Sequence, residues 1–191
     1  MSAKSLLSAA LVAAAVGFSA IVVAPPVLAE MTVMVGGAPM YPSKNIIENA
    51  VNSKDHTTLV AAVKAAGLVD TLEGPGPFTV LAPTNEAFAE LPKGTVETLL
   101  KPENKDQLVA ILTYHVLAGK WTAADIAAKV DEMGGKFAAK TVEGGELTFM
   151  RSGKSHLTVT DAKGDVARIT IADVLQSNGV IHVINKVLIP G

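Results

Sequence analysis

The stretch NGVIHVINKVLIP, residues 178–190, decides the expected fold, because its opening segment VIHVI is apolar on both faces of an extended chain. A strand with one face in solvent alternates apolar and polar residues, whereas a strand covered on both faces is continuously apolar. The segment is therefore expected to be a buried strand at the centre of a sheet. His182 in its middle either belongs to a functional site or fastens the core through hydrogen bonds.

Four strand-length runs lie ahead of this stretch and show the period of two that is typical of half-buried strands. They are separated by the turn sequences EGG, GK and AKG, which favour antiparallel hairpins. The runs are KFAAKTV (136–142), ELTFMRS (146–152), HLTVTD (156–161) and DVARITIA (165–172).

The first two thirds of the chain predict mostly helices. Ser43 is expected to cap a helix in KNIIENAVN (44–52), and Gly67 is expected to end a second helix over Thr57–Ala66. Further helices are expected to begin at Thr84 and to occur in 94–101, 102–115 and 122–130, with one early strand at 78–82. Helices followed by an antiparallel sheet indicate an α+β fold, whose sheet the early strand is expected to join.

Residues 1–29 have the layout of a secretory signal peptide, with Lys4 as the only early charge and a plausible cleavage point after Ala29. An uncleaved membrane anchor is the alternative, because the apolar run is long. Residues 30–44 are expected to form an extended arm and 45–191 a single domain. The folded part is expected to be secreted, periplasmic or displayed at the cell surface, with no integral membrane domain after cleavage.

The composition argues against several classes of protein. A net charge of −2 gives no reason to expect a nucleic-acid partner, and the lack of cysteine excludes disulfides and thiolate metal sites. The four histidines lack metal-ligand spacing, and the chain has no nucleophile elbow, Walker loop or dinucleotide motif. We therefore expect no enzyme activity, no metal and no cofactor.

Three segments together resemble the fasciclin (FAS1) domain family. FTVLAPTNEAFAELP (78–92) is similar to its first signature, Tyr114 and His115 to its central Tyr-His pair, and residues 178–190 to its second signature. The order and spacing match from about Asn45 to Pro190. Single-domain bacterial members are similar to this chain in layout, and the resemblance implies a wedge of about seven mainly antiparallel strands with five or more helices packed around it.

Two positions depart from the family pattern. Asn85 and Asn185 stand where many members have aspartate. Asparagine keeps an acceptor oxygen and loses the negative charge, so a capping role is expected to survive at both positions while a role for a carboxylate is not.

The resemblance also supplies candidate site residues. Interaction with a partner is assigned to Tyr114, His115, Thr84 and Asn85, and a structural role to His182, Asn178, Gly179 and Asn185. For Tyr114 and His115 a second interpretation stays open, in which both rings pack inward and bond to the backbone.

The family resemblance and the lack of catalytic motifs predict a monomeric, non-enzymatic module for cell adhesion or for binding a protein or glycan at the cell surface or matrix. The alternative is a carrier of an apolar small molecule such as a carotenoid-type pigment. Met31, Met34 and Met40 would then serve as adaptable apolar contacts.

Overall fold

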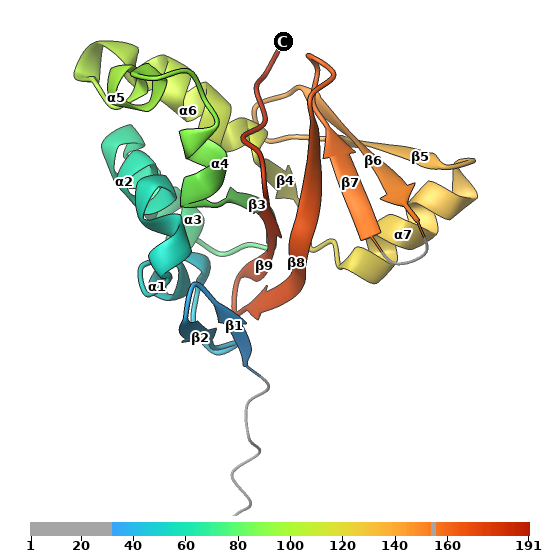
Figure 1. Ribbon diagram of the computed structural model, residues 1–191. Helices are drawn as coiled ribbons and strands as arrows, with labels where there is room; N and C mark the ends of the chain where they lie inside the picture. The colour runs from blue at the N-terminus through green and yellow to red at the C-terminus, as the bar shows by residue number, and fades with distance from the viewer. Residues whose placement is uncertain (1–31, 154–155) are drawn as a thin grey trace, which may run out of the picture.

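The protein is built on a seven-stranded sheet, described here from a computed structural model that covers residues 32–153 and 156–191 (Figure 1). The expected signal peptide and Met31 lie outside these residues. The strand order is β4-β3-β9-β8-β7-β6-β5. The strands are β3 (Phe78–Pro83), β4 (Val116–Ala118), β5 (Lys136–Lys140), β6 (Glu146–Ser152), β7 (His156–Thr160), β8 (Val166–Gln176) and β9 (Gly179–Ile184).

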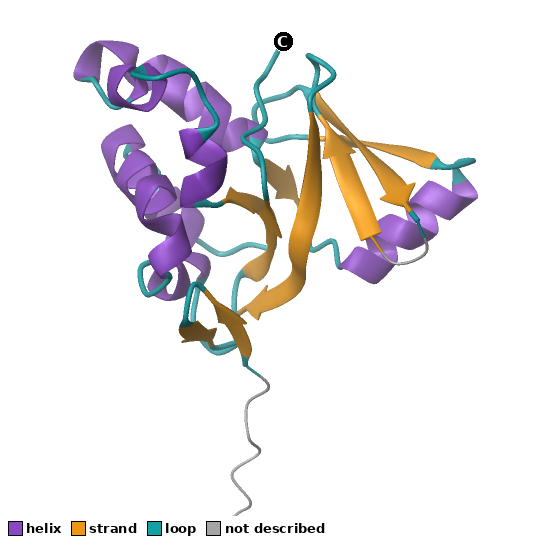
Figure 2. Ribbon diagram, in the orientation of Figure 1, coloured by secondary structure: helices purple, strands orange, loops and turns teal. Residues whose placement is uncertain are grey.

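Seven α-helices of the described chain pack around this sheet, which confirms the expected α+β fold. Helices α1 to α6 gather beside β3 and β9, whereas α7 lies against β5 and β6 (Figures 1 and 2). The helices are α1 (Ile46–Ala50), α2 (Thr57–Ala66), α3 (Val69–Glu73), α4 (Asn85–Ala89), α5 (Thr95–Leu99), α6 (Lys105–Tyr114) and α7 (Ala123–Glu132), with 3-10 turns at Lys54–His56 and Pro102–Asn104.

Strand β9 is the buried central strand that the sequence predicts. All six of its residues are buried, and it lies between β3 and β8. It pairs parallel with β3, so that Leu81 lies opposite His182, while the other pairings along the sheet are antiparallel. The two family signatures are therefore neighbouring strands, although about a hundred residues separate them in the sequence.

The helix starts agree with the sequence at two positions and differ at a third. Thr84 caps α4 by accepting from the Ala87 amide at 3.3 Å, and Thr122 caps α7 in a reciprocal box with Asp125. For α1 the prediction was wrong, because the cap is Asn45, in a box with Glu48, and not Ser43.

The described part of the expected extended arm forms a hairpin instead, of β1 (Val33–Val35) and β2 (Ala38–Met40). The two turn residues are Gly36 and Gly37, whose φ angles of 58° and 76° are those of a tight type I′ turn. The inward-facing side chains of Val35 and Met40 are only 4% and 3% exposed, so the hairpin belongs to the core and the folded unit begins before residue 45.

Two apolar clusters make up the core. The larger joins α1 to α6 with the β3 and β9 side chains that face them, and the second lies between α7 and strands β5 to β8. In the described ranges, 32–153 and 156–191, no helix has both the length and the apolar character needed to cross a bilayer.

Candidate functional site

Tyr114, the last residue of α6, is fully buried and ties this helix to the other half of the sheet. Its hydroxyl donates to the carbonyl of Glu146 in β6 at 2.8 Å and accepts from the amide of Ala162, after β7, at 3.0 Å. Both capacities of the hydroxyl are thus used within the chain.

His115 follows directly and is also satisfied internally. Nδ1 lies 2.8 Å from the carbonyl of Ile111, which can only accept, and Nε2 accepts from the amide of Leu188 at 3.0 Å. These partners place the proton on Nδ1. Burial lowers the pKa of His115 from 6.5 to about 4, against the opposing effect of the Ile111 carbonyl, so the ring is neutral at physiological pH.

His182 lies in β9 with the opposite tautomer. Its Nε2 donates to the carbonyl of Trp121 at 2.8 Å, and its Nδ1 accepts from the amide of Asp173 at 3.2 Å. Burial lowers its pKa as well. Asp173 has a φ of 57°, rare for a residue with a side chain, and its carboxylate accepts from the Ala123 amide at 2.7 Å. The imidazole therefore fastens β9 and β8 to the segment that leads into α7.

Asn178 and Gly179, at the start of the second signature, both contact backbone groups of other segments. Asn178 accepts from the amide of Ile46 at 3.1 Å and donates to the carbonyls of Leu72 and Gly74 at 2.7 and 3.0 Å. Gly179 is required by close approach, because a Cβ there would lie 2.1 Å from the carbonyl oxygen of Phe78.

Asn185 and Asn85, the two departures from the family pattern, both use their amide oxygens. Asn185 Oδ1 accepts from the amide of Arg168 in β8 at 2.7 Å. Asn85 Oδ1 accepts from the amide of Thr58 at 3.0 Å, and its Nδ2 donates to the carbonyl of Lys54 at 2.8 Å. Asn85 thus holds the start of α2 against the start of α4.

The structure brings these residues together along β3 and β9, but it gives the interaction candidates internal roles. Tyr114 and His115 are 0% and 3% exposed, and every polar atom of their side chains is hydrogen-bonded within the chain. Thr84 and Asn85 are half-buried and likewise bond within the chain. This arrangement corresponds to the inward-packed interpretation of Tyr114 and His115, and a role of these residues in binding a partner stays a prediction.

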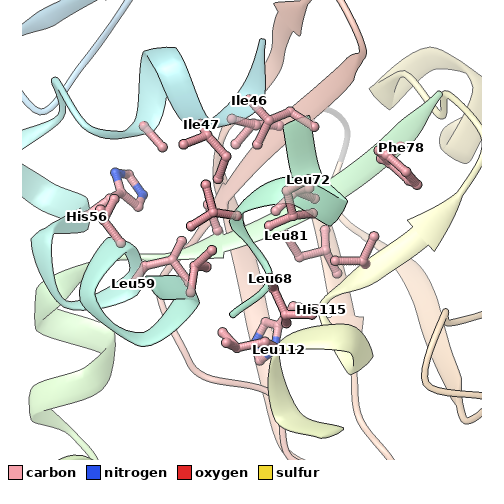
Figure 3. A pocket seen from close by; sticks show the side chains of 18 of the residues that line it. Ile46, Ile47, His56, Leu59, Leu68, Leu72, Phe78, Leu81, Leu112 and His115 are labelled. Atoms are coloured by element: carbon pink, nitrogen blue, oxygen red, sulfur yellow. The ribbon is translucent and has the colours of Figure 1, made fainter. Parts of the chain in front are cut away.

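An apolar cavity of about 80 Å3 lies between helices α1 to α3 and strand β3 (Figure 3). The surface of this cavity is apolar, with Ile47, Leu59 and Leu72 among the side chains that face it. It does not coincide with the hydrogen-bonded network, although His115 reaches its lower edge in the view of Figure 3.

His56, on the wall of this cavity, is a residue that sequence reasoning missed. It is 3% exposed, and its Nδ1 lies 2.8 Å from the hydroxyl of Ser53. Its Nε2 has no hydrogen-bond partner among the described residues. Burial lowers its pKa, and the carbonyl of Ala82 partly opposes that effect. The 3-10 turn that directs the ring inward has no periodicity from which its burial could be read.

Metal-ligating side chains do not cluster in the part of the chain that the structure describes. Over residues 32–153 and 156–191, no group of three or more histidine, aspartate or glutamate side chains could hold a metal ion.

Together the fold and the buried network define an α+β domain in which the polar residues of the two signature strands act as internal fasteners. Comparison with known proteins agrees, because the Fasciclin domain model matches residues 54–190. The chain belongs to the fasciclin family.

Similar proteins come from bacteria and animals. The chain is 45% identical over 183 residues to Protein sll1483 of Synechocystis sp., covering 95% of this chain and 93% of that protein. It is 42% identical over 132 residues to the transforming growth factor-beta-induced protein ig-h3 of Sus scrofa, covering 69% of this chain but 17% of that protein.

A solved structure shares the fold. The FAS1 domain pair from the insect cell adhesion molecule Fasciclin I superposes with a TM-score of 0.69 at 15% identity, covering 84% of this chain and 58% of that one.

Proposed function

We propose that this protein is a secreted or cell-surface module that binds a protein or glycan of the surface or matrix as a monomer and catalyses no reaction. Family membership supports the proposal, as does the likeness of its fold to a domain pair from an insect cell adhesion molecule. The internal use of the signature side chains supports it too, because residues whose polar atoms are all bonded stabilise a scaffold and leave recognition to other surfaces.

The observation that carries the proposal is the open face of strands β5 to β8. Helix α7 covers one side of these strands, where Phe149, Val159 and Ala167 are fully buried. The other side carries the alternate residues, which are exposed or half-buried, and no helix lies in front of it in Figure 1. A four-stranded surface of this kind is broad enough to hold a macromolecule.

A binding experiment tests this function directly. The protein is expressed with its own leader, purified as the cell processes it, immobilised, and exposed to envelope and matrix fractions from the organism that makes it. We expect saturable binding at micromolar concentration or below, and no binding to the same protein after unfolding in urea. An empty result at micromolar concentration contradicts the proposal.

The processed form tests the location. If residues 1–29 are removed, mass spectrometry should give the mass of a chain that begins at Glu30. If they are retained as an anchor, the mass should include residues 1–29 and only detergent should extract the protein from the membrane.

The apolar cavity favours a second candidate function, the carrier of an apolar small molecule. Its volume of about 80 Å3 is smaller than the ~150 Å3 of an engineered cavity that binds benzene, so a carotenoid-sized pigment would enter only if helices α1 to α3 moved outward. Of the two described methionines proposed as contacts, Met40 lines the cavity and Met34 is 57% exposed. An absorption spectrum of the protein from its native source decides this candidate, because a carrier of pigment must show a visible chromophore.

A further inference from the structure

We infer that the open face of β5 to β8 binds an anionic polysaccharide, laid across the strands between Lys136 in β5 and Arg168 in β8. The inference rests on the proposed function and names the class of partner. It follows from three observations on this face: the placement of its cations, their lack of ion-pair partners, and the shape and chemistry of the surface between them.

The strand registers place the two cations at opposite ends of one row. Lys136 lies opposite Met150, Met150 opposite Thr158, and Thr158 opposite Arg168. Neighbouring strands are about 4.8 Å apart, so three strand spacings separate the Cα atoms of Lys136 and Arg168 by about 14 Å. A ligand that lies along the whole row and contacts both cations is therefore expected to be an extended polymer.

The cations on this face have no ion-pair partner among the described residues. Lys136, Lys140 and Arg168 are exposed and make no salt bridge there, and Glu146, opposite Lys140, is the one acid in these strand rows. Arg151 gives the contrast. It points to the other face of β6, where its guanidinium pairs with both carboxylate oxygens of Asp131 on α7 at 2.7 Å.

The charge on this face runs against that of the chain as a whole. The chain has a net charge of −2, yet the rows of the open face carry three cations and one acid. A local excess of positive charge at the two edges complements a polymer with regularly spaced sulfate or carboxylate groups. A guanidinium such as that of Arg168 can bind either group with two parallel hydrogen bonds.

Two small hydroxyl side chains lie in the row next to that of Lys136 and Arg168. The next row along the strands is Ala138, Thr148, Thr160 and Val166, in which the two threonines lie directly opposite each other. Among the described residues neither hydroxyl of Thr148 and Thr160 has a hydrogen-bond partner, so both can donate to and accept from sugar hydroxyls. No side chain in this row is larger than valine, so a chain laid along the neighbouring row of Lys136 and Arg168 can also contact the two threonine hydroxyls.

The test uses defined polymers and matched variants. Binding of the processed protein to dextran sulfate, alginate and uncharged dextran of similar length is measured by calorimetry at several salt concentrations. We compare the wild type with a Lys136→Gln, Arg168→Gln double variant and with a control variant, Lys93→Gln, Lys101→Gln. The control makes the same change of net charge on exposed lysines that flank α5, outside the β5 to β8 rows.

We expect the wild type to bind at least one of the two anionic polymers and not dextran, with affinity that falls as salt rises because bound counterions are released. Comparison of dextran sulfate with alginate shows which anion is recognised. The double variant should bind at least tenfold more weakly with a shallower salt dependence, and the control within twofold of wild type. All three proteins should keep the same melting temperature, because the replaced side chains are exposed.

Three outcomes overturn the inference: no binding of either anionic polymer, equal loss of affinity in the control variant, or binding to anionic lipid vesicles that the double substitution reduces while polysaccharide binding stays unchanged. In any of these cases, a protein partner recovered in the envelope experiment would leave the proposed function standing. If the protein binds neither an anionic polymer nor any component of the envelope and matrix fractions, both the inference and the proposed function are rejected.

Discussion

The two halves of the sheet are covered in different ways, and they depend on the sequence differently. Around β3 and β9 both faces of the sheet are buried. Individual polar side chains there donate to single carbonyls of other segments, as His182 does to Trp121 and Asn178 to Leu72. In β5 to β8 only the face toward α7 is buried, and the alternation of side chains is enough to define it. The first half therefore depends on residue identity and the second on residue pattern.

Strand β8 passes from one half to the other. Residues 166–170 alternate between exposed and buried, and the register with β9 then shifts twice, between Ile169 and Ile171 and between Ile171 and Val174. Asp173, with its positive φ, lies in the second irregularity and bonds to both His182 and Ala123. Bulges strengthen the twist of a sheet, so this segment is where an open half-sheet turns into a buried one.

The largest expected effect is that of adding one methyl group in the buried half. Gly179→Ala places a Cβ against the Phe78 backbone, which cannot move without breaking the parallel pair, and should lower the free energy of unfolding by about 3 kcal/mol or more. Ala138→Ser on the open half adds one atom as well and should change it by less than about 0.5 kcal/mol. Urea denaturation measures both, and similar values would contradict the contrast between the halves.

A decrease in pH is expected to lower the free energy of unfolding by nearly as much. The pKa of His115 is about 6.5 when unfolded and about 4 when folded, so between these values the unfolded chain binds more protons. Stability should be full above about pH 6.5 and fall by about 3 kcal/mol from this residue alone as the pH decreases to about 4. His182 and His56, whose pKa values are also lowered, add to the loss.

Urea midpoints measured from pH 7.5 to 4.5 test this dependence. His115→Gln should flatten the pH profile, whatever its effect at neutral pH. An unchanged slope would mean that His115 does not stay neutral in the folded state.

His182→Ala should have the next largest effect on stability. It leaves the carbonyl of Trp121 and the amide of Asp173 without their partner, at a cost of about 1–3 kcal/mol. The melting temperature should therefore fall by several degrees, as calorimetry would show. Hydrogen exchange should show reduced amide protection at residues 121–123 as well as in β9. A loss of amide protection confined to β9 would contradict the role of His182 as a link between β9, β8 and the segment before α7.

Tyr114→Phe tests the connection between the two halves. It removes only the hydroxyl, whose partners lie in β6 and after β7, and should cost about 1 kcal/mol with the ring still packed. Amide exchange at Ala162 should accelerate. If it does not, that amide finds another acceptor, and the hydroxyl is not the link between α6 and the open half.

The smallest effect is expected from Asn185→Asp, which restores the residue that is common in the family. The oxygen that accepts from the Arg168 amide is kept, and the side chain is exposed, so the unfolding free energy should change by less than about 0.5 kcal/mol. Asn185→Ala, which removes the acceptor, provides the comparison and should cost about 1 kcal/mol. Equal effects of the two substitutions would show that the bond contributes little.

Much of the fold could be predicted from the sequence where one local signal was sufficient. Period-two runs predicted β5 to β8, and the oxygens of Thr84 and Thr122 predicted the starts of α4 and α7. The hairpin of residues 33–40 was missed although its Gly36-Gly37 pair is a recognised turn signal, because the strands beside it have only three residues each.

The rest depends on contacts between distant segments. Strand β4 is three residues long and is defined mainly by its pairing with β3. Asn49 of α1 is fully buried and donates to the side chain of Gln176 in β8, a partner 127 residues away in the sequence. At the candidate site, the residue types could be named from the resemblance, but whether each ring faced a partner or the core depended on carbonyls and amides from other elements.

The position of β9 at the centre of the sheet has a consequence for synthesis. A growing chain presents β3 about a hundred residues before the strand that pairs with it. Until then, β3 and β8 each keep an edge of free amides and carbonyls, to which a strand of another nascent chain could add. Completion of the sheet must wait until residue 184 has left the ribosome, so this protein is expected to fold slowly and to need protection from aggregation until then.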